Sequence, residues 1–245
     1  MKLQSGSVAV FSPVALTPEV KEAVTALGEV KYIVAPDFEV SQCRNIQPLI
    51  ARAHVMQHHL KIGEWYKEYP NAKVLGPEGL PEKRMKQKNE DVPFSVVFTA
   101  KDKATTKVDP EFDADFDYEY VDGHANKELV FDYKPDKTLI EADFLFNLPA
   151  TEQFSKSGES PTSGFLTRLF VALNGTAGDA TWQKRLIWYG TSSGNRPSFN
   201  KSVARIATWD FNRIIPCHGE IIDEGGKGIF DKIFQWHLEA AKKGQ

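Results

Sequence analysis

Short apolar runs that resemble buried strands alternate with helical stretches along this chain, and the strands fall into two groups. The first group includes Val8–Phe11 and Val30–Ala35, separated by a helix that Thr17 caps and that ends before Gly28. Helices are expected before, between and after the two groups. The sequence therefore predicts a layered α/β or α+β domain in which sheets pack together or are covered by helices.

The second group of strands begins with a strict alternation over Asp109–Tyr120, with acidic residues on one face and mostly aromatic residues on the other. Period two of this kind predicts a half-buried antiparallel strand or hairpin. Glu128–Asp132 and Lys137–Glu141 follow as strands around a turn at Pro135-Asp136, and Arg213–Pro216 is a single strand in a helical C-terminal region. The acidic face is expected to point into solvent, because side chains along one strand do not converge on a cation.

The composition favours an intracellular protein and leaves small, roughly neutral or cationic ligands open. With 30 Lys and Arg against 33 Asp and Glu in 245 residues, no excess of positive charge is present to bind nucleic acid or an anionic membrane. Two cysteines cannot build a disulfide framework, and the N-terminus lacks the apolar core of a signal peptide. We expect one domain over residues 1–245, a cytoplasmic location and a small-molecule substrate, and the oligomeric state stays open.

Histidines and an aspartate follow apolar strands at several points of the chain. His58-His59 come after the first group of strands, whereas His124, Asp143 and His218 follow strands of the second group. Side chains at strand ends can converge, and a metal ion needs ligands at about 2.0–2.2 Å from several directions. Histidine with carboxylate, and without thiolate, suits Zn, Fe or Mn. Any one of these histidines alone is more typical of a surface residue or a hydrogen-bonded residue than of a metal ligand.

The order of these motifs resembles the metallo-β-lactamase fold superfamily: a His-rich cluster, then Gly-His, then a strand ending in Asp, then Pro-x-His-Gly. The chain is most similar to an uncharacterised branch of that superfamily, the domain of unknown function DUF4336, in which a His-His pair precedes Gly-x-Trp and Tyr-Pro-x-Ala. The residues that carry the resemblance are His58-His59-Leu60, Gly63-Glu64-Trp65, Tyr69-Pro70-Asn71-Ala72, Asp122-Gly123-His124, Thr138–Asp143 and Ile215-Pro216-Cys217-His218-Gly219.

The resemblance implies a four-layer αββα sandwich with one or two divalent metal ions at the edge of the sheets, zinc before iron or manganese. The ligands it implies are His58, His59, His124, His218 and Asp143, with Asp143 able to bridge two ions. It implies a metal-dependent hydrolase-like activity, in which a metal-bound water attacks an ester, thioester, amide or phosphoester. Asp143 is one of two candidate catalytic residues.

One departure from the superfamily pattern affects this expectation. The usual cluster His-x-His-x-Asp-His has its nearest match in His54-Val55-Met56-Gln57-His58-His59, which has Met in place of the second His and His in place of Asp. The missing carboxylate commonly orients or deprotonates the attacking water. The alternative function is therefore a non-catalytic protein of this fold with a degenerate metal site, acting as a binding or interaction module.

The segment Val40–Gln57 lengthens the connection between the strand and the His pair. Without it, Asp37-Phe38-Glu39 would lead directly into His58-His59, a connection of ordinary length. Every Val codon begins with GT and Gln57 can be encoded by CAG, so the segment can be an insertion or a retained intron with GT and AG ends. On this hypothesis Asp37, or Glu39, supplies the missing catalytic carboxylate.

Overall fold

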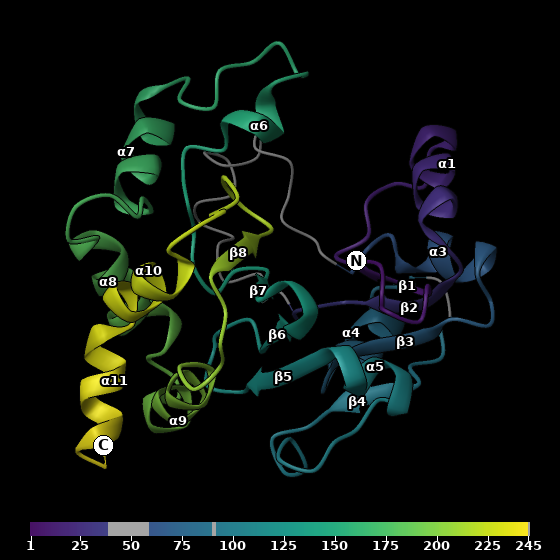
Figure 1. The fold of residues 1–245 in the computed structure, drawn as a ribbon. Helices are drawn as coiled ribbons and strands as arrows, with labels where there is room; N and C mark the ends of the chain where they lie inside the picture. The colour runs from purple at the N-terminus through teal and green to yellow at the C-terminus, as the bar shows by residue number, and fades with distance from the viewer. Residues whose placement is uncertain (39–58, 90–91, 245) are drawn as a thin grey trace.

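The computed structural model describes residues 1–38, 59–89 and 92–244 (Figure 1). Within these residues, eight strands form two four-stranded sheets. The strands are β1 (Val8–Phe11), β2 (Val30–Val34), β3 (Lys73–Pro77), β4 (Val96–Phe98), β5 (Phe116–Val121), β6 (Glu128–Tyr133), β7 (Thr138–Glu141) and β8 (Arg213–Pro216). The helices are α1 (Pro18–Leu27), α3 (Ile62–Glu68), α4 (Leu80–Lys86), α5 (Pro110–Asp115), α6 (Thr151–Phe154), α7 (Phe165–Leu173), α8 (Thr181–Leu186), α9 (Arg196–Ile206), α10 (Gly226–Ile233) and α11 (Gln235–Lys242).

The first sheet is parallel throughout, in the order β1-β2-β3-β4. Helix α1 connects β1 to β2, and it begins where the sequence predicted: the Thr17 side chain accepts a hydrogen bond from Val20 N, and Pro18 occupies the first turn. Because all four strands run the same way, their carboxyl ends lie along one edge of this sheet.

The second sheet is mixed, in the order β5-β6-β7-β8. Strands β5, β6 and β7 are antiparallel neighbours, whereas β8 lies parallel to β7, with Glu141 opposite Pro216. The carboxyl ends of β5, β7 and β8 and the amino end of β6 therefore lie at the same edge of the second sheet.

Three apolar layers separate four layers of secondary structure. The first lies between the helices α1, α3 and α4 and the first sheet, and it includes Ile33, Ile62 and Trp65. The second lies between the two sheets, where Tyr32 of β2 and Phe131 of β6 belong to one buried cluster. The third lies between the second sheet and helices α8 to α11. The predicted α/β class and αββα sandwich are confirmed.

The strand predicted over Asp109–Tyr120 is wrong in its first half. Residues Pro110–Asp115 form helix α5, and only Phe116 and the residues after it belong to β5. The local reason is a helix cap: the Asp109 side chain accepts a hydrogen bond from Phe112 N at 2.9 Å, and proline follows at the first helical position. Capping decided the structure of this segment against its period-two pattern.

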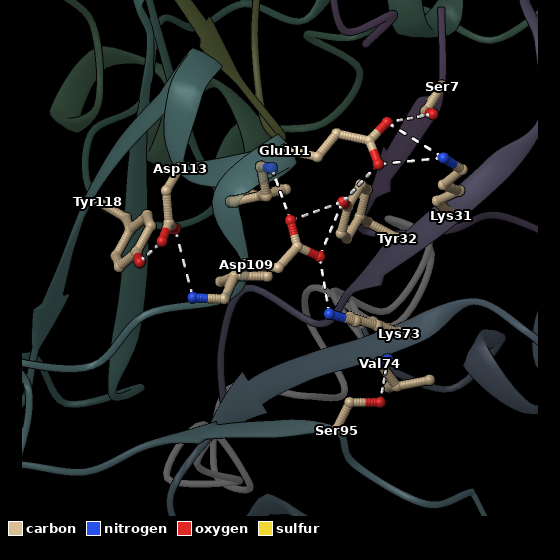
Figure 2. A network of polar contacts seen from close by, with 12 residues as sticks. Ser7, Lys31, Tyr32, Lys73, Val74, Ser95, Asp109, Glu111, Asp113 and Tyr118 are labelled. Atoms are coloured by element: carbon tan, nitrogen blue, oxygen red, sulfur yellow. Dashed lines mark hydrogen bonds and ion pairs between the residues drawn. The ribbon is translucent and has the colours of Figure 1, made fainter. Parts of the chain in front are cut away.

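A polar network covers the amino end of the first sheet, opposite the edge where its strands end (Figure 2). The Tyr32 hydroxyl donates to both oxygens of Asp109, and Lys73 Nζ lies 2.8 Å from the same carboxylate. Glu111 accepts hydrogen bonds from Ser7 and from Lys31, so α5 is joined to β1, β2 and β3. The carboxyl edge has a different set of polar residues, described below.

No helix in the described parts of the chain is long and apolar enough to cross a membrane.

Candidate functional site

His124, Asp143 and His218 lie at the carboxyl edge of the second sheet. Because β7 and β8 are parallel neighbours, Asp143 and His218 leave the sheet side by side. His124 lies in the connection from β5 to β6, which ends at the same edge. The chain after β2 also reaches this edge, because Pro36 O accepts a hydrogen bond from Leu129 N at 2.6 Å.

Asp143 and His218 face each other directly. Asp143 Oδ1 lies 3.4 Å from His218 Nε2, and the Asp143 side chain is buried whereas that of His218 is 22% exposed. Phe146 stacks on the imidazole, with 5.8 Å between ring centroids and 18° between ring planes. This packing orients His218 while leaving one side of its ring near solvent.

His124 lies beneath this pair with both ring nitrogens hydrogen-bonded. Its Nδ1 accepts from Asn126 N at 3.0 Å, so Nε2 carries the proton and donates to Asp143 O at 3.2 Å. Burial lowers the pKa of His124 to about 4, which leaves the imidazole neutral at physiological pH. In this structure His124 therefore supports the backbone of Asp143.

Asn126 joins Asp143 to Phe38, the residue after Asp37. Its Nδ2 donates to Asp143 Oδ2 at 2.6 Å, and its carbonyl oxygen accepts from Phe38 N at 2.7 Å, next to the fully buried Asp37. Desolvation raises the pKa of the Cys217 thiol to about 12, and the charges of Asp143 and Asp37 both add to this shift. The backbone on both sides of Asp37 is bonded to residues at this edge, because Pro36 O accepts from Leu129 N and Phe38 N donates to Asn126 O.

Of the His pair, the structure describes His59 alone. Its side chain is buried, and its carbonyl oxygen accepts a hydrogen bond from Arg84 Nη1. Arg84 is itself buried. His58 and the whole segment 40–57, including His54, lie outside the described residues, so the predictions that concern them stay predictions.

The glycines of the Gly-His and His-Gly motifs allow close approach of two backbones. A Cβ on Gly123 would lie 2.5 Å from Asn195 O and 2.6 Å from Phe199 N, at the start of α9. Gly219 has φ of +111°, and a Cβ there would lie 2.3 Å from Asn147 O. Gly123, which precedes His124, and Gly219, which follows His218, are thus both required to be glycine for steric reasons.

Two buried glutamates, Glu128 and Glu141, were not predicted from the sequence. They lie at the start of β6 and the end of β7 and accept hydrogen bonds from the backbone around Asp143. Burial raises the pKa of both carboxyl groups well above the usual range, and the negative charge of Asp143 raises them further. The sequence signal that could have pointed to these two glutamates is a charged residue at the end of an otherwise apolar strand.

The described side chains do not by themselves form a complete metal centre. Among residues 1–38, 59–89 and 92–244, no three His, Cys, Asp or Glu side chains are grouped closely enough to hold an ion. The donors that do meet are one imidazole and one carboxylate, His218 and Asp143. A centre at this edge would need a further ligand, and the remaining predicted candidates are in the His58-His59 pair.

The sequence matches no protein-family model and no curated protein sequence. Similar solved structures include a metallo-β-lactamase from Pontibacter korlensis, at 11% identity and a TM-score of 0.46, covering 90% of this chain and 77% of that chain. The metallo-β-lactamase FIM-1 from Pseudomonas aeruginosa, in its mono-zinc form, has 10% identity, a TM-score of 0.46 and coverages of 93% and 77%. The flavodiiron protein from Giardia intestinalis has 14% identity, a TM-score of 0.49 and coverages of 94% and 48%.

Proposed function

We propose that this chain is a metal-binding, hydrolase-like protein of the metallo-β-lactamase fold, similar to the DUF4336 branch, with its centre at the Asp143–His218 edge. The ligands proposed are His218 and Asp143 with His58 and His59, and His124 as a further candidate. Zinc is the first choice of metal, before iron or manganese, and the donor set of imidazole and carboxylate suits all three.

The observation that carries the proposal is the spacing between His218 Nε2 and Asp143 Oδ1. Their separation of 3.4 Å exceeds the usual length of an N–H···O hydrogen bond. Two ligands about 2.0–2.2 Å from one tetrahedral zinc ion are about 3.3–3.6 Å apart. The pair is thus spaced as two ligands of one ion would be.

A divalent ion bound at such a centre supplies Lewis acidity and lowers the pKa of water. The chain's own residues would supply orientation and proton transfer. Asn126 donates to Asp143 Oδ2, which leaves Oδ1 directed toward His218. Asp37 is the proposed proton acceptor, in place of the aspartate missing from the His cluster. The substrate proposed is a small ester, thioester, amide or phosphoester.

Metal content of the purified protein tests the proposal. We expect about one or more equivalents of a divalent metal in the wild type, measured by elemental analysis. Asp143→Asn and His218→Ala should each lower the occupancy at limiting metal by about 10-fold or more, because each removes a ligand.

Asp132→Asn is the matched control for Asp143→Asn. Asp132 is equally buried and lies on the same sheet, in β6, but it contacts no predicted site residue in the hydrogen bonds described. Its substitution should leave the metal content unchanged. A wild-type protein with less than about a tenth of an equivalent after gentle purification and after incubation with zinc would refute the proposal.

The alternative, a non-catalytic protein with a degenerate site, is favoured by His124. Both of its ring nitrogens are hydrogen-bonded inside the protein, as in a purely structural residue. Metal binding without hydrolysis of any of the four substrate classes would support this alternative.

A further inference from the structure

The turn 142–145, which carries Asp143, is bonded to two buried glutamates on neighbouring strands. Glu128 Oε1 accepts from Ala142 N at 2.6 Å, and both Glu128 carboxylate oxygens lie 3.1 Å from Asp143 N. Glu141 Oε2 accepts from Phe144 N at 2.7 Å and more weakly from Leu145 N at 3.3 Å. Every backbone N–H of the turn therefore points to one of these two carboxylates.

The register of the sheet explains why Glu128 occupies this position. Phe131 of β6 pairs with Ile140 of β7, so an extended antiparallel ladder would place Glu128 opposite Asp143. The paired strand β7 instead ends at Glu141, and the backbone turns away. The Glu128 side chain takes the place of the carbonyl groups that a continued ladder would supply.

Two buried carboxylates at this place are costly for the fold. Glu128 is fully buried and Glu141 is 1% exposed, and Glu141 Oε1 has no hydrogen-bond partner among the described residues. A buried polar atom without a partner costs free energy. An apolar residue at either position would leave two backbone N–H groups of the turn without these acceptors, so the two glutamates are explained by what the turn needs to hold its shape.

We infer that Glu128 and Glu141 are positioning residues, which hold the turn 142–145 so that the Asp143 carboxylate faces His218. His124 supports the same turn from the other side through Asp143 O. The hydrogen-bonding role follows from the geometry alone, whereas its consequence for metal affinity rests on the proposed function.

Amide hydrogen exchange separates the roles of the two glutamates. Glu128→Ala should raise the exchange rates of Ala142 and Asp143 by about 10-fold or more, and Glu141→Ala those of Phe144 and Leu145, because each loses its acceptor. Glu128→Gln keeps one acceptor oxygen and should restore protection of Ala142. Wild-type exchange rates across the turn in both folded Ala variants would overturn the inference.

Binding of Co²⁺, followed by its visible absorption, tests the consequence at the site. Glu128→Ala should weaken the affinity for Co²⁺ by about 10-fold or more, with partial recovery in Glu128→Gln and no change in Asp132→Asn. Equal affinity in all four proteins would contradict positioning of a ligand. If the wild type binds no Co²⁺, the proposed function fails, and the exchange measurement still decides the role of the glutamates.

If Glu128→Ala does not fold, Glu141→Ala decides the question. It removes the acceptor of Phe144 N and Leu145 N, whereas Glu128 still accepts from Ala142 N. Exchange at Phe144 should then rise while that at Ala142 stays the same, and unchanged exchange at Phe144 would overturn the inference.

Discussion

At the scale of single residues, hydrogen bonds to backbone groups determine the geometry of the sheet edge around Asp143. The carboxylates of Glu128 and Glu141 bind backbone N–H groups, and His124 binds a backbone carbonyl. Glycine serves the same edge by allowing backbones to touch, as Gly219 does against Asn147. Contacts to the backbone thus account for much of the geometry here.

Gly219→Ala should destabilise the protein by about 3 kcal/mol, because the added methyl group meets backbone atoms and the residue must keep a positive φ. Gly178→Ala is the control: its φ is also positive, but no atom lies within 4 Å of the added Cβ, so about 1 kcal/mol is expected. Urea unfolding measures both. Equal losses in the two variants would show that the contact with Asn147 is unimportant.

At the scale of elements, the attachment of α5 to the first sheet should depend on pH. Hydrogen bonds from Ser5 and Ser7, and then the Lys31 ammonium, lower the pKa of Glu111 to about 2. A carboxyl group with a lowered folded-state pKa stabilises the fold above its unfolded pKa of about 4.3, and this contribution is lost as pH falls toward 2.

Glu111→Gln should therefore lower the free energy of unfolding at pH 7 by about 1 kcal/mol, a value reduced for solvent screening because the side chain is partly exposed. The difference from the wild type should shrink as the pH approaches 2.5. Urea unfolding at both pH values measures it, and a difference that does not depend on pH would contradict the ionic role of Glu111.

The segment Val40–Gln57, predicted as an insertion or retained intron, belongs to the connection between β2 and β3 of the first sheet. Phe38 O accepts from Lys83 Nζ at 2.6 Å, and His59 O accepts from the next residue of α4, Arg84. The two ends of the connection thus contact the same turn of one helix. If Glu39 were joined directly to His58, the shortened chain from Phe38 to His59 could span at most about 11 Å.

We expect the chain without Val40–Gln57 to fold with a stability within about 1 kcal/mol of the full chain, because loop length contributes little to stability. Thermal unfolding and metal content of the two chains measure the effect. A Gly-Ser linker of equal length in place of the segment is the control. Loss of folded structure in the deletion, but not with the linker, would contradict the insertion hypothesis, as would uniform retention of these codons in the transcript.

Local signals predicted most of the strands of the fold. The Thr17 cap and the apolar runs of β1, β2 and β8 gave correct elements because those signals act without competition. At Asp109 a helix cap competed with a period-two pattern, and the cap prevailed. Glu128 and Glu141 could not be assigned a role, because their partners depend on the register between strands.

At the scale of the whole molecule, the αββα layers separate two kinds of sheet edge. The amino end of the first sheet is covered by the network around Asp109 and Glu111, which joins elements to each other (Figure 2). The carboxyl ends of strands from both sheets meet at the other edge, where Asp143, His218 and Asp37 lie. Parallel pairing of β7 with β8 is what brings the first two together.

The proposal that Asp143 and His218 hold one metal ion can be tested by a crystal structure of the protein loaded with zinc, with anomalous scattering recorded at the zinc edge. We expect an anomalous peak about 2.0–2.2 Å from both His218 Nε2 and an Asp143 carboxylate oxygen. A zinc-loaded crystal with no peak at this edge, or with peaks only on other side chains, would contradict it.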